Sequence, residues 1–215
     1  MHVLYYLEVR DSILILALLS FLVTGMYLAL GVYILRSNRR AALNRLFFLI
    51  CLSLAVWSLA YTFLPSAATK EQAWSWFRLS AIGWTLSPAL VFHFCLLLSK
   101  RSKPGESKSA LLMIYLAAAY FLLRALGGEL RFADFVQTRF GWAQVYDRLT
   151  FEFVAFAVYA LAAVLWGLGL VFNQGRRAAR TVERRQAQFV SLSGLPVLVA
   201  VAVFAIVLPW LEIRN

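Results

Sequence analysis

The chain has 215 residues, of which 62% are hydrophobic and 15% aromatic, and its formal net charge is +11. Soluble domains are nearer to half apolar, so this composition excludes an ordinary water-soluble domain. The basic charge lies between long apolar runs rather than on a soluble surface, which argues against nucleic acid as a partner.

Six apolar runs lie between clusters of charged residues, and each could cross a bilayer as a helix, which takes roughly 20 residues. They cover residues 12–35, 43–64, 74–99, 110–126, 150–172 and 189–210. Backbone groups inside hydrocarbon must be paired within the protein, and no uninterrupted two-residue period indicates a barrel. The sequence therefore predicts an all-α, polytopic transmembrane helix bundle, with a single membrane sensor domain over residues 1–215.

Basic residues gather in alternate connections between these runs. Thirteen of the 21 lysines and arginines lie within residues 36–45, 100–108 and 173–188, where the only acidic residues are Glu106 and Glu183. The remaining basic and acidic residues balance. The positive-inside rule places the basic connections in the cytoplasm, so the N-terminus is expected outside.

The longest connection on the outer side covers residues 127–148 and is rich in aromatic residues. Its rings include Phe135, Phe140 and Trp142, set among charges of both signs. One interpretation is an aromatic belt that anchors the loop at the lipid headgroups. The other is an interfacial lid that packs over the bundle and shapes a ligand entrance. The two interpretations are compatible.

The sequence offers little for catalysis. It has no metal-ligand spacing, no phosphate-binding glycine loop and no arrangement of serine, histidine and aspartate typical of a hydrolase. Cys51 and Cys95 lie within apolar runs, where cysteine usually behaves as a small hydrophobe. We therefore expect no enzyme, no metal and no cofactor within these residues.

Charged side chains close to a bilayer are costly and are therefore candidates for function. Arg78, Arg124 and Glu152 fall at the outer ends of the third, fourth and fifth runs. A carboxylate facing guanidinium groups there could line a polar pocket or form a structural pair, and snorkelling side chains would look the same. The candidate ligand-binding set also contains Trp57 and Tyr61, for which core packing is the alternative, together with Trp84 and with Trp142 of the outer connection.

The third run carries a candidate hinge and switch. Ser80, Gly83 and Ser87 form a stripe of small residues where another helix can approach. Pro88 removes one backbone hydrogen bond and is expected to kink the helix. His93 could titrate as a switch, or it could simply hydrogen-bond to a neighbouring helix. Ordinary bundle packing explains the stripe and the proline equally well.

Three stretches carry a family resemblance: "NRLFFLICLSLAVWSLAYTF" (44–63), "WSWFRLSAIGWTLSPALVFHFCLLLS" (74–99) and "ERRQAQFVSLSGLPVLVAVAVFAIVLP" (183–209). They resemble the second, third and sixth helices of the seven-transmembrane N-terminal region of bacterial sensor histidine kinases. The resemblance implies a multi-pass protein of the bacterial inner membrane with its N-terminus outside. Pro209 and Trp210, at the outer boundary, predict a turn toward a seventh span beyond these 215 residues.

The resemblance also implies a function. The chain would be the sensory input module, or receptor, of a two-component system, which passes an extracellular or membrane cue to a cytoplasmic signalling domain in cis. The cue could be a small molecule, a peptide or a lipid, and sensor kinases of this kind generally work as homodimers. The family supplies no ligand-contact motif that can be carried over. The alternatives are a small transporter component, disfavoured by a midplane poor in charge, and a non-catalytic membrane-assembly subunit.

Overall fold

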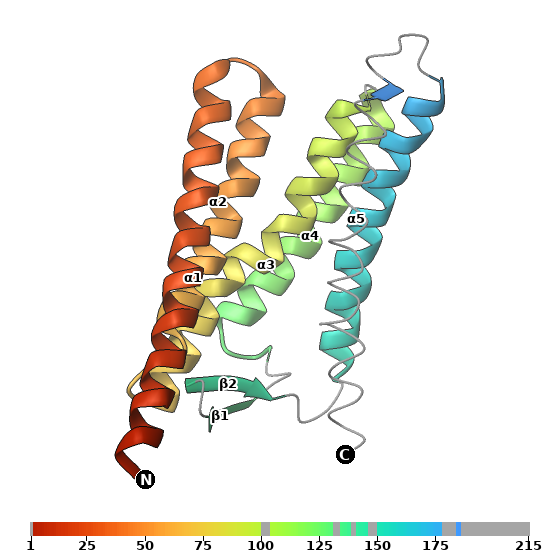
Figure 1. Cartoon of the computed structure of the whole chain (residues 1–215). Coiled ribbons are helices and arrows are strands. Elements are labelled where there is room, and N and C mark those ends of the chain that lie inside the picture. Colours follow the sequence, from red (N-terminus) through yellow and green to blue (C-terminus); the bar gives the residue numbers. More distant parts are fainter. Residues whose placement is uncertain are drawn as a thin grey trace.

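The computed structural model describes residues 2–99, 104–130, 134–138, 141–145, 150–177 and 184–185. Within them the chain forms five helices and one two-stranded sheet, which follow each other along the sequence (Figure 1). The elements are α1 (His2–Ser37), α2 (Ala42–Phe63), α3 (Lys70–Leu98), α4 (Pro104–Leu126), β1 (Asp134–Thr138), β2 (Gly141–Val145) and α5 (Phe151–Arg177).

The predicted helical membrane bundle is confirmed. Each of the five helices is long and apolar enough to cross a bilayer, and they correspond to the first five predicted runs. The sixth predicted run, residues 189–210, lies outside the described residues, so six spans are not seen.

Helices α3 and α4 begin several residues before their apolar runs, at residues that favour the start of a helix. Helix α3 begins at Lys70, where the Thr69 side chain caps it by accepting a hydrogen bond from the Gln72 amide at 3.2 Å. Helix α4 begins at Pro104, and proline is favoured in the first turn because its missing N–H would have no helical partner there. Apolarity therefore marks the membrane span, whereas the caps mark the helix ends.

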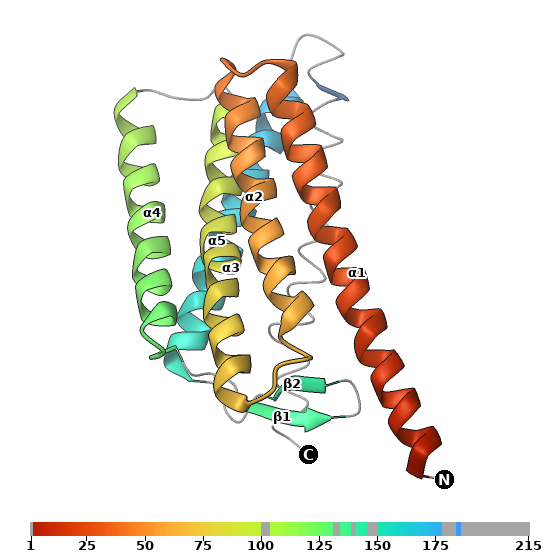
Figure 2. The same ribbon diagram turned by 90° about the vertical axis from the view of Figure 1, so that its left-hand side faces the viewer.

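Helix α3 is the centre of the bundle. It packs against α2, α4 and α5, whereas α1 packs on α2 at the edge, an arrangement visible in Figures 1 and 2. In the most apolar stretch of α3, 56% of the residues are buried inside the protein, compared with 6% in α1. The exposed leucine and phenylalanine side chains of α1 are those expected of a helix that faces lipid.

Glycines allow the helices to approach closely at three interfaces. Gly83 of α3 faces α2, where an added Cβ would lie 2.5 Å from the Ser53 carbonyl oxygen. Gly31 of α1 faces Cys51, and Gly167 of α5 faces Cys95. Both cysteines are free and buried, and each therefore serves as a small apolar residue opposite a glycine.

Side-chain hydrogen bonds join three of the helix pairs. The Ser58 hydroxyl donates to the Ser20 carbonyl oxygen at 2.8 Å and so links α2 to α1. The Tyr159 hydroxyl of α5 donates to the Thr85 carbonyl oxygen of α3 at 3.1 Å. In a third hydrogen bond, Nδ1 of His93 in α3 lies 3.0 Å from the hydroxyl oxygen of Tyr115 in α4.

The connection over residues 127–148 contains a β-hairpin. Strands β1 and β2 pair antiparallel in a register that sets Asp134 opposite Val145 and Thr138 opposite Gly141. We call the end of the bundle that carries the hairpin, the 64–69 connection and the C-terminus of α4 the hairpin end. The opposite end, with Arg36, Arg39, Arg40 and Arg45 around the α1–α2 connection, is the basic end (Figure 1).

The contact at Gly83 predicts a position-specific effect of added bulk. In Gly83→Ala the new methyl group meets the α2 backbone, and relieving the overlap should cost about 1–3 kcal/mol of stability. The matched control is Gly169→Ala in α5, where nothing lies within 4 Å and alanine should be neutral or stabilising by up to about 1 kcal/mol. Thermal unfolding in detergent compares the two variants. Equal midpoints would show that α2 and α3 do not approach closely at Gly83.

Candidate functional site

The hairpin is held on the 64–69 connection through backbone acceptors. The Trp142 amide donates to the Pro65 carbonyl oxygen at 3.1 Å, and the Trp142 indole Nε1 donates to the Ala67 carbonyl oxygen at 2.8 Å. Gly141 touches Pro65 so closely that a Cβ would lie 2.8 Å from its carbonyl carbon, and its φ is +87°. Only glycine satisfies both conditions without strain.

Two polar side-chain contacts add to this docking. The Lys70 ammonium group at the start of α3 lies 2.7 Å from the Asp134 carboxylate of β1. The Tyr61 hydroxyl of α2 lies 3.4 Å from the Gln144 side-chain oxygen of β2. The lysine–aspartate pair is exposed, so it contributes little stability and serves mainly to set the register of β1 over α3.

An aromatic cluster lies beneath the hairpin. Phe135 of β1 is only 2% exposed, and its ring meets Trp74 edge-on at 5.0 Å and Phe77 at 5.7 Å. Edge-to-face contacts continue to α4 and α5, where Phe156 meets Phe121 and Trp84. We define the aromatic cluster as Trp74, Phe77, Trp84, Phe121, Phe135, Phe153, Phe156 and Tyr159. Through it β1, α3, α4 and α5 share one core.

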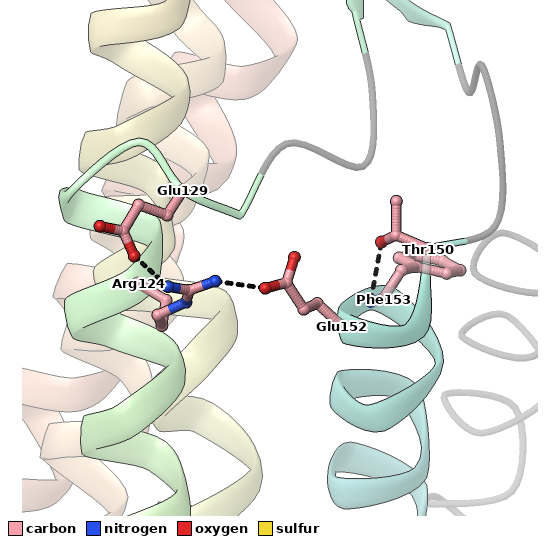
Figure 3. A network of polar contacts seen from close by, with 5 residues as sticks. All are labelled: Arg124, Glu129, Thr150, Glu152 and Phe153. Atoms are coloured by element: carbon pink, nitrogen blue, oxygen red, sulfur yellow. Dashed lines mark hydrogen bonds and ion pairs between the residues drawn. The ribbon is translucent and has the colours of Figure 1, made fainter.

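Arg124 is the centre of the charged group at the hairpin end. Its Nη1 is paired with Glu129 and its Nη2 with Glu152, as Figure 3 shows. Glu152 lies in the first turn of α5, where the helix dipole favours a carboxylate, and Thr150 caps the same turn by accepting from the Phe153 amide at 3.2 Å. Elsewhere the backbones of α4 and α5 stay apart, and the two helices meet through rings, with Phe121 of α4 against Phe156 and Tyr159 of α5. The Arg124–Glu152 pair therefore joins two helices that both pack mainly on α3.

A glycine turn brings Glu129 to Arg124. The Glu129 amide donates back to the Arg124 carbonyl oxygen at 3.0 Å, and Gly128 adopts a φ of +75°. The Arg78 guanidinium group packs on the same turn, since a Cβ at Gly128 would lie 2.5 Å from Nη2 of Arg78. Both predicted arginines thus contact the turn at residues 127–129.

The other predicted residues lie around the same region. Trp57 packs at the Gly83 contact and against the aromatic cluster, and Tyr61 reaches the hairpin. Trp84 is buried, and its indole Nε1 donates to the Ser80 hydroxyl at 3.2 Å. Trp142 docks the hairpin. A ligand role for any of them stays a prediction.

The predicted hinge and switch lie further along α3. Pro88 is buried within a helix that runs unbroken from Lys70 to Leu98. It leaves the Trp84 carbonyl without its helical donor, and the Tyr159 hydroxyl bonds to the next carbonyl along, that of Thr85. The hydrogen bond between His93 and Tyr115 is the kind of interhelical contact that the sequence offered as the alternative to a switch.

Sequence reasoning missed several residues of this end. Glu129, Lys70, Asp134 and Gln144 make polar contacts that no motif indicates. Of these four residues, only Glu129 could have been found from the sequence. It directly follows two glycines, which indicate a turn, at the end of the apolar run that carries Arg124. Among the described residues, no group of three histidine, cysteine, aspartate or glutamate side chains could hold a metal ion.

Comparison with known proteins gives one match. The family model described as the N-terminal 7TM region of histidine kinase matches residues 13–213, which is nearly the whole chain. No curated protein and no solved structure matches the chain.

Removal of the indole donor should loosen the hairpin. Trp142→Phe keeps an aromatic ring but leaves the Ala67 carbonyl without its 2.8 Å partner. A lost hydrogen bond of about 1 kcal/mol corresponds to roughly fivefold faster amide exchange in residues 134–145 if local opening governs it. Trp76→Phe is the control, since Trp76 stacks on Phe63. Unchanged exchange in Trp142→Phe, measured by mass spectrometry, would contradict docking through the indole.

Proposed function

The chain belongs to the family of N-terminal 7TM regions of histidine kinases, and from this premise we propose how it senses. It is a membrane sensory region and not the catalytic part of such a kinase. In our proposal an extracellular or membrane-borne cue acts at the hairpin end. The bundle passes the change to the basic end, and from there to a cytoplasmic signalling domain in the same polypeptide.

The proposed orientation follows from charge. Arginines 36, 39, 40 and 45 surround the α1–α2 connection, and the positive-inside rule assigns such a cluster to the cytoplasm. The hairpin end then faces outward from the bacterial inner membrane, with the N-terminus on the same side. A cue from outside therefore meets the hairpin, the aromatic cluster and the charged group first.

The observation that carries the mechanism is the ion pair between Arg124 and Glu152. It joins α4 to α5 at the end where the cue is proposed to arrive. A cue that draws either group away would remove one restraint between two helices whose far ends lie at the basic end. The cue then favours one of two helix arrangements through its different contacts with each.

The proposed output unit is a homodimer. Histidine kinases generally signal as dimers, and the exposed apolar surface of α1 and α5 leaves room for a second copy or for lipid within the membrane. In the proposal, a change in the angle between α4 and α5 alters how two copies present their signalling domains to each other.

Orientation can be tested by cysteine labelling in intact cells. Arg40→Cys and Gln137→Cys each place a thiol at an exposed position, one at the basic end and one on the hairpin. A membrane-impermeant maleimide should label Gln137→Cys in intact spheroplasts and Arg40→Cys only after permeabilisation. The wild type, whose two cysteines are buried, is the blank. Labelling of Arg40→Cys in intact spheroplasts would reverse the proposed topology.

The ion pair can be tested through kinase output. In the full-length protein in membranes, Glu152→Gln should shift basal autophosphorylation, because the neutral amide no longer holds Arg124 across to α5. Glu129→Gln is the matched control, since Glu129 belongs to the turn that directly follows α4 and its loss leaves the link to α5 in place.

A double-mutant cycle separates this coupling from general damage. Arg124→Gln and Glu152→Gln together should shift the output no more than either change alone, since both remove the same contact. Additive shifts, with normal amounts of each protein in the membrane, would show that the pair does not act as one unit in signalling.

A further inference from the structure

Arg78 differs from Arg124 in what surrounds its guanidinium group. Arg124 is paired with both Glu129 and Glu152. Among the residues that the structure describes, no carboxylate pairs with Arg78. The Nε of both arginines is buried without a hydrogen-bond partner in that part of the chain, so only Arg78 combines such an Nε with the lack of a described carboxylate partner. A buried donor without an acceptor is unfavourable, so such an atom marks a place where an acceptor is wanted.

The position of this guanidinium group is fixed by the turn after α4. It lies directly on Gly128, where a Cβ would be 2.5 Å from Nη2, 3.0 Å from Cζ and 3.2 Å from Nε. The φ of +75° also favours glycine at this position. The contact limits the freedom of a long side chain, so less conformational entropy is lost when an acceptor binds.

The neighbourhood of Arg78 is apolar and aromatic on its own helix. Trp74 lies one turn before Arg78 on the same face of α3, and Phe77 precedes it directly. Both rings belong to the aromatic cluster, and Trp74 meets Phe135 of the hairpin edge-on. A ligand held by Arg78 would therefore have rings beside it and the hairpin above it.

From these observations we infer that Arg78 binds the oxyanion of an amphiphilic ligand, a carboxylate or phosphate carried on an apolar body that lies against Trp74. The planar guanidinium fork matches such an oxyanion, and the oxyanion gives Arg78 the negative partner that Glu129 and Glu152 give Arg124. This inference rests on the proposed function and names the chemical class of its cue. The same chemistry is offered by a free amphiphilic acid and by an anionic lipid headgroup.

The test uses the full chain in nanodiscs of phosphatidylcholine. The ligand is 11-bromoundecanoate, whose bromine quenches nearby tryptophan fluorescence, and its uncharged methyl ester is the matched control. The acid should quench saturably and the ester should not. Arg78→Gln should weaken the apparent affinity of the acid about tenfold, the loss expected for one charge-assisted contact. Arg36→Gln, which removes a charge at the basic end, should leave the affinity unchanged.

A second variant covers the case in which Arg78→Gln does not fold, as judged by thermal unfolding. Arg78→Lys keeps the positive charge but loses the fork, so its affinity for the acid should fall below that of the wild type. Acid affinity equal to wild type in either folded variant, or quenching by the ester equal to that by the acid, would overturn the inference.

The lipid composition distinguishes the two sources of the oxyanion. When phosphatidylglycerol replaces part of the phosphatidylcholine, a headgroup ligand should compete and lower the apparent affinity of the acid for wild type but not for Arg78→Gln. An unchanged affinity identifies a free acid as the ligand. Because quenching reports binding and Glu152→Gln reports kinase output, each idea can fail alone. If quenching does not depend on Arg78 but Glu152→Gln still shifts kinase output, only the inference about the ligand is refuted.

Discussion

The fold depends on one constraint, namely that α3 must be contacted on three sides without water, and two of its neighbours approach it closely at glycines. Gly83 admits α2, and Gly167 of α5 fits beside Cys95. Within a membrane the hydrophobic effect does not drive helices together, so close packing and interhelical hydrogen bonds must do so. The close contacts along α3 and the bond from Tyr159 to Thr85 supply both. The other helices are positioned by reference to this one.

The two ends of the bundle differ in kind because of this arrangement. Near the basic end, apolar side chains such as Phe92 and Leu96 and the His93–Tyr115 bond hold α3 to its neighbours. At the hairpin end, large rings and charges do so, with Phe135 inserted from β1 and Arg124 paired across to α5. Ionic groups are less well satisfied by hydrocarbon than by an interface, so the position of the Arg124 pairs at an end of the bundle is a consequence of the bilayer.

Much of the architecture could be predicted from the sequence, because apolar run length fixes where helices cross. The helix starts at Lys70 and Pro104 could not, since caps lie outside the apolar runs. Because a charge inside a bilayer is unfavourable, the sequence placed Arg124 and Glu152 at the same end of the bundle. Which arginine pairs with which carboxylate depends on which helices are neighbours, and the periodicity of the sequence does not reveal that. The hairpin was missed because each strand has only five residues and its stability comes from docking on Pro65 and Ala67 rather than from its own pattern.

That docking has a consequence for how the chain can vary. Trp142 binds two main-chain carbonyl oxygens, and every amino acid supplies a carbonyl oxygen. The 64–69 connection can therefore exchange most of its side chains without losing the hairpin, provided its backbone path is kept. The hairpin side of the contact does not tolerate substitution in the same way, because no other residue replaces Gly141 or the indole of Trp142. A homologue could thus diverge freely at Ser66 and Ala68 while its glycine–tryptophan pair stays fixed.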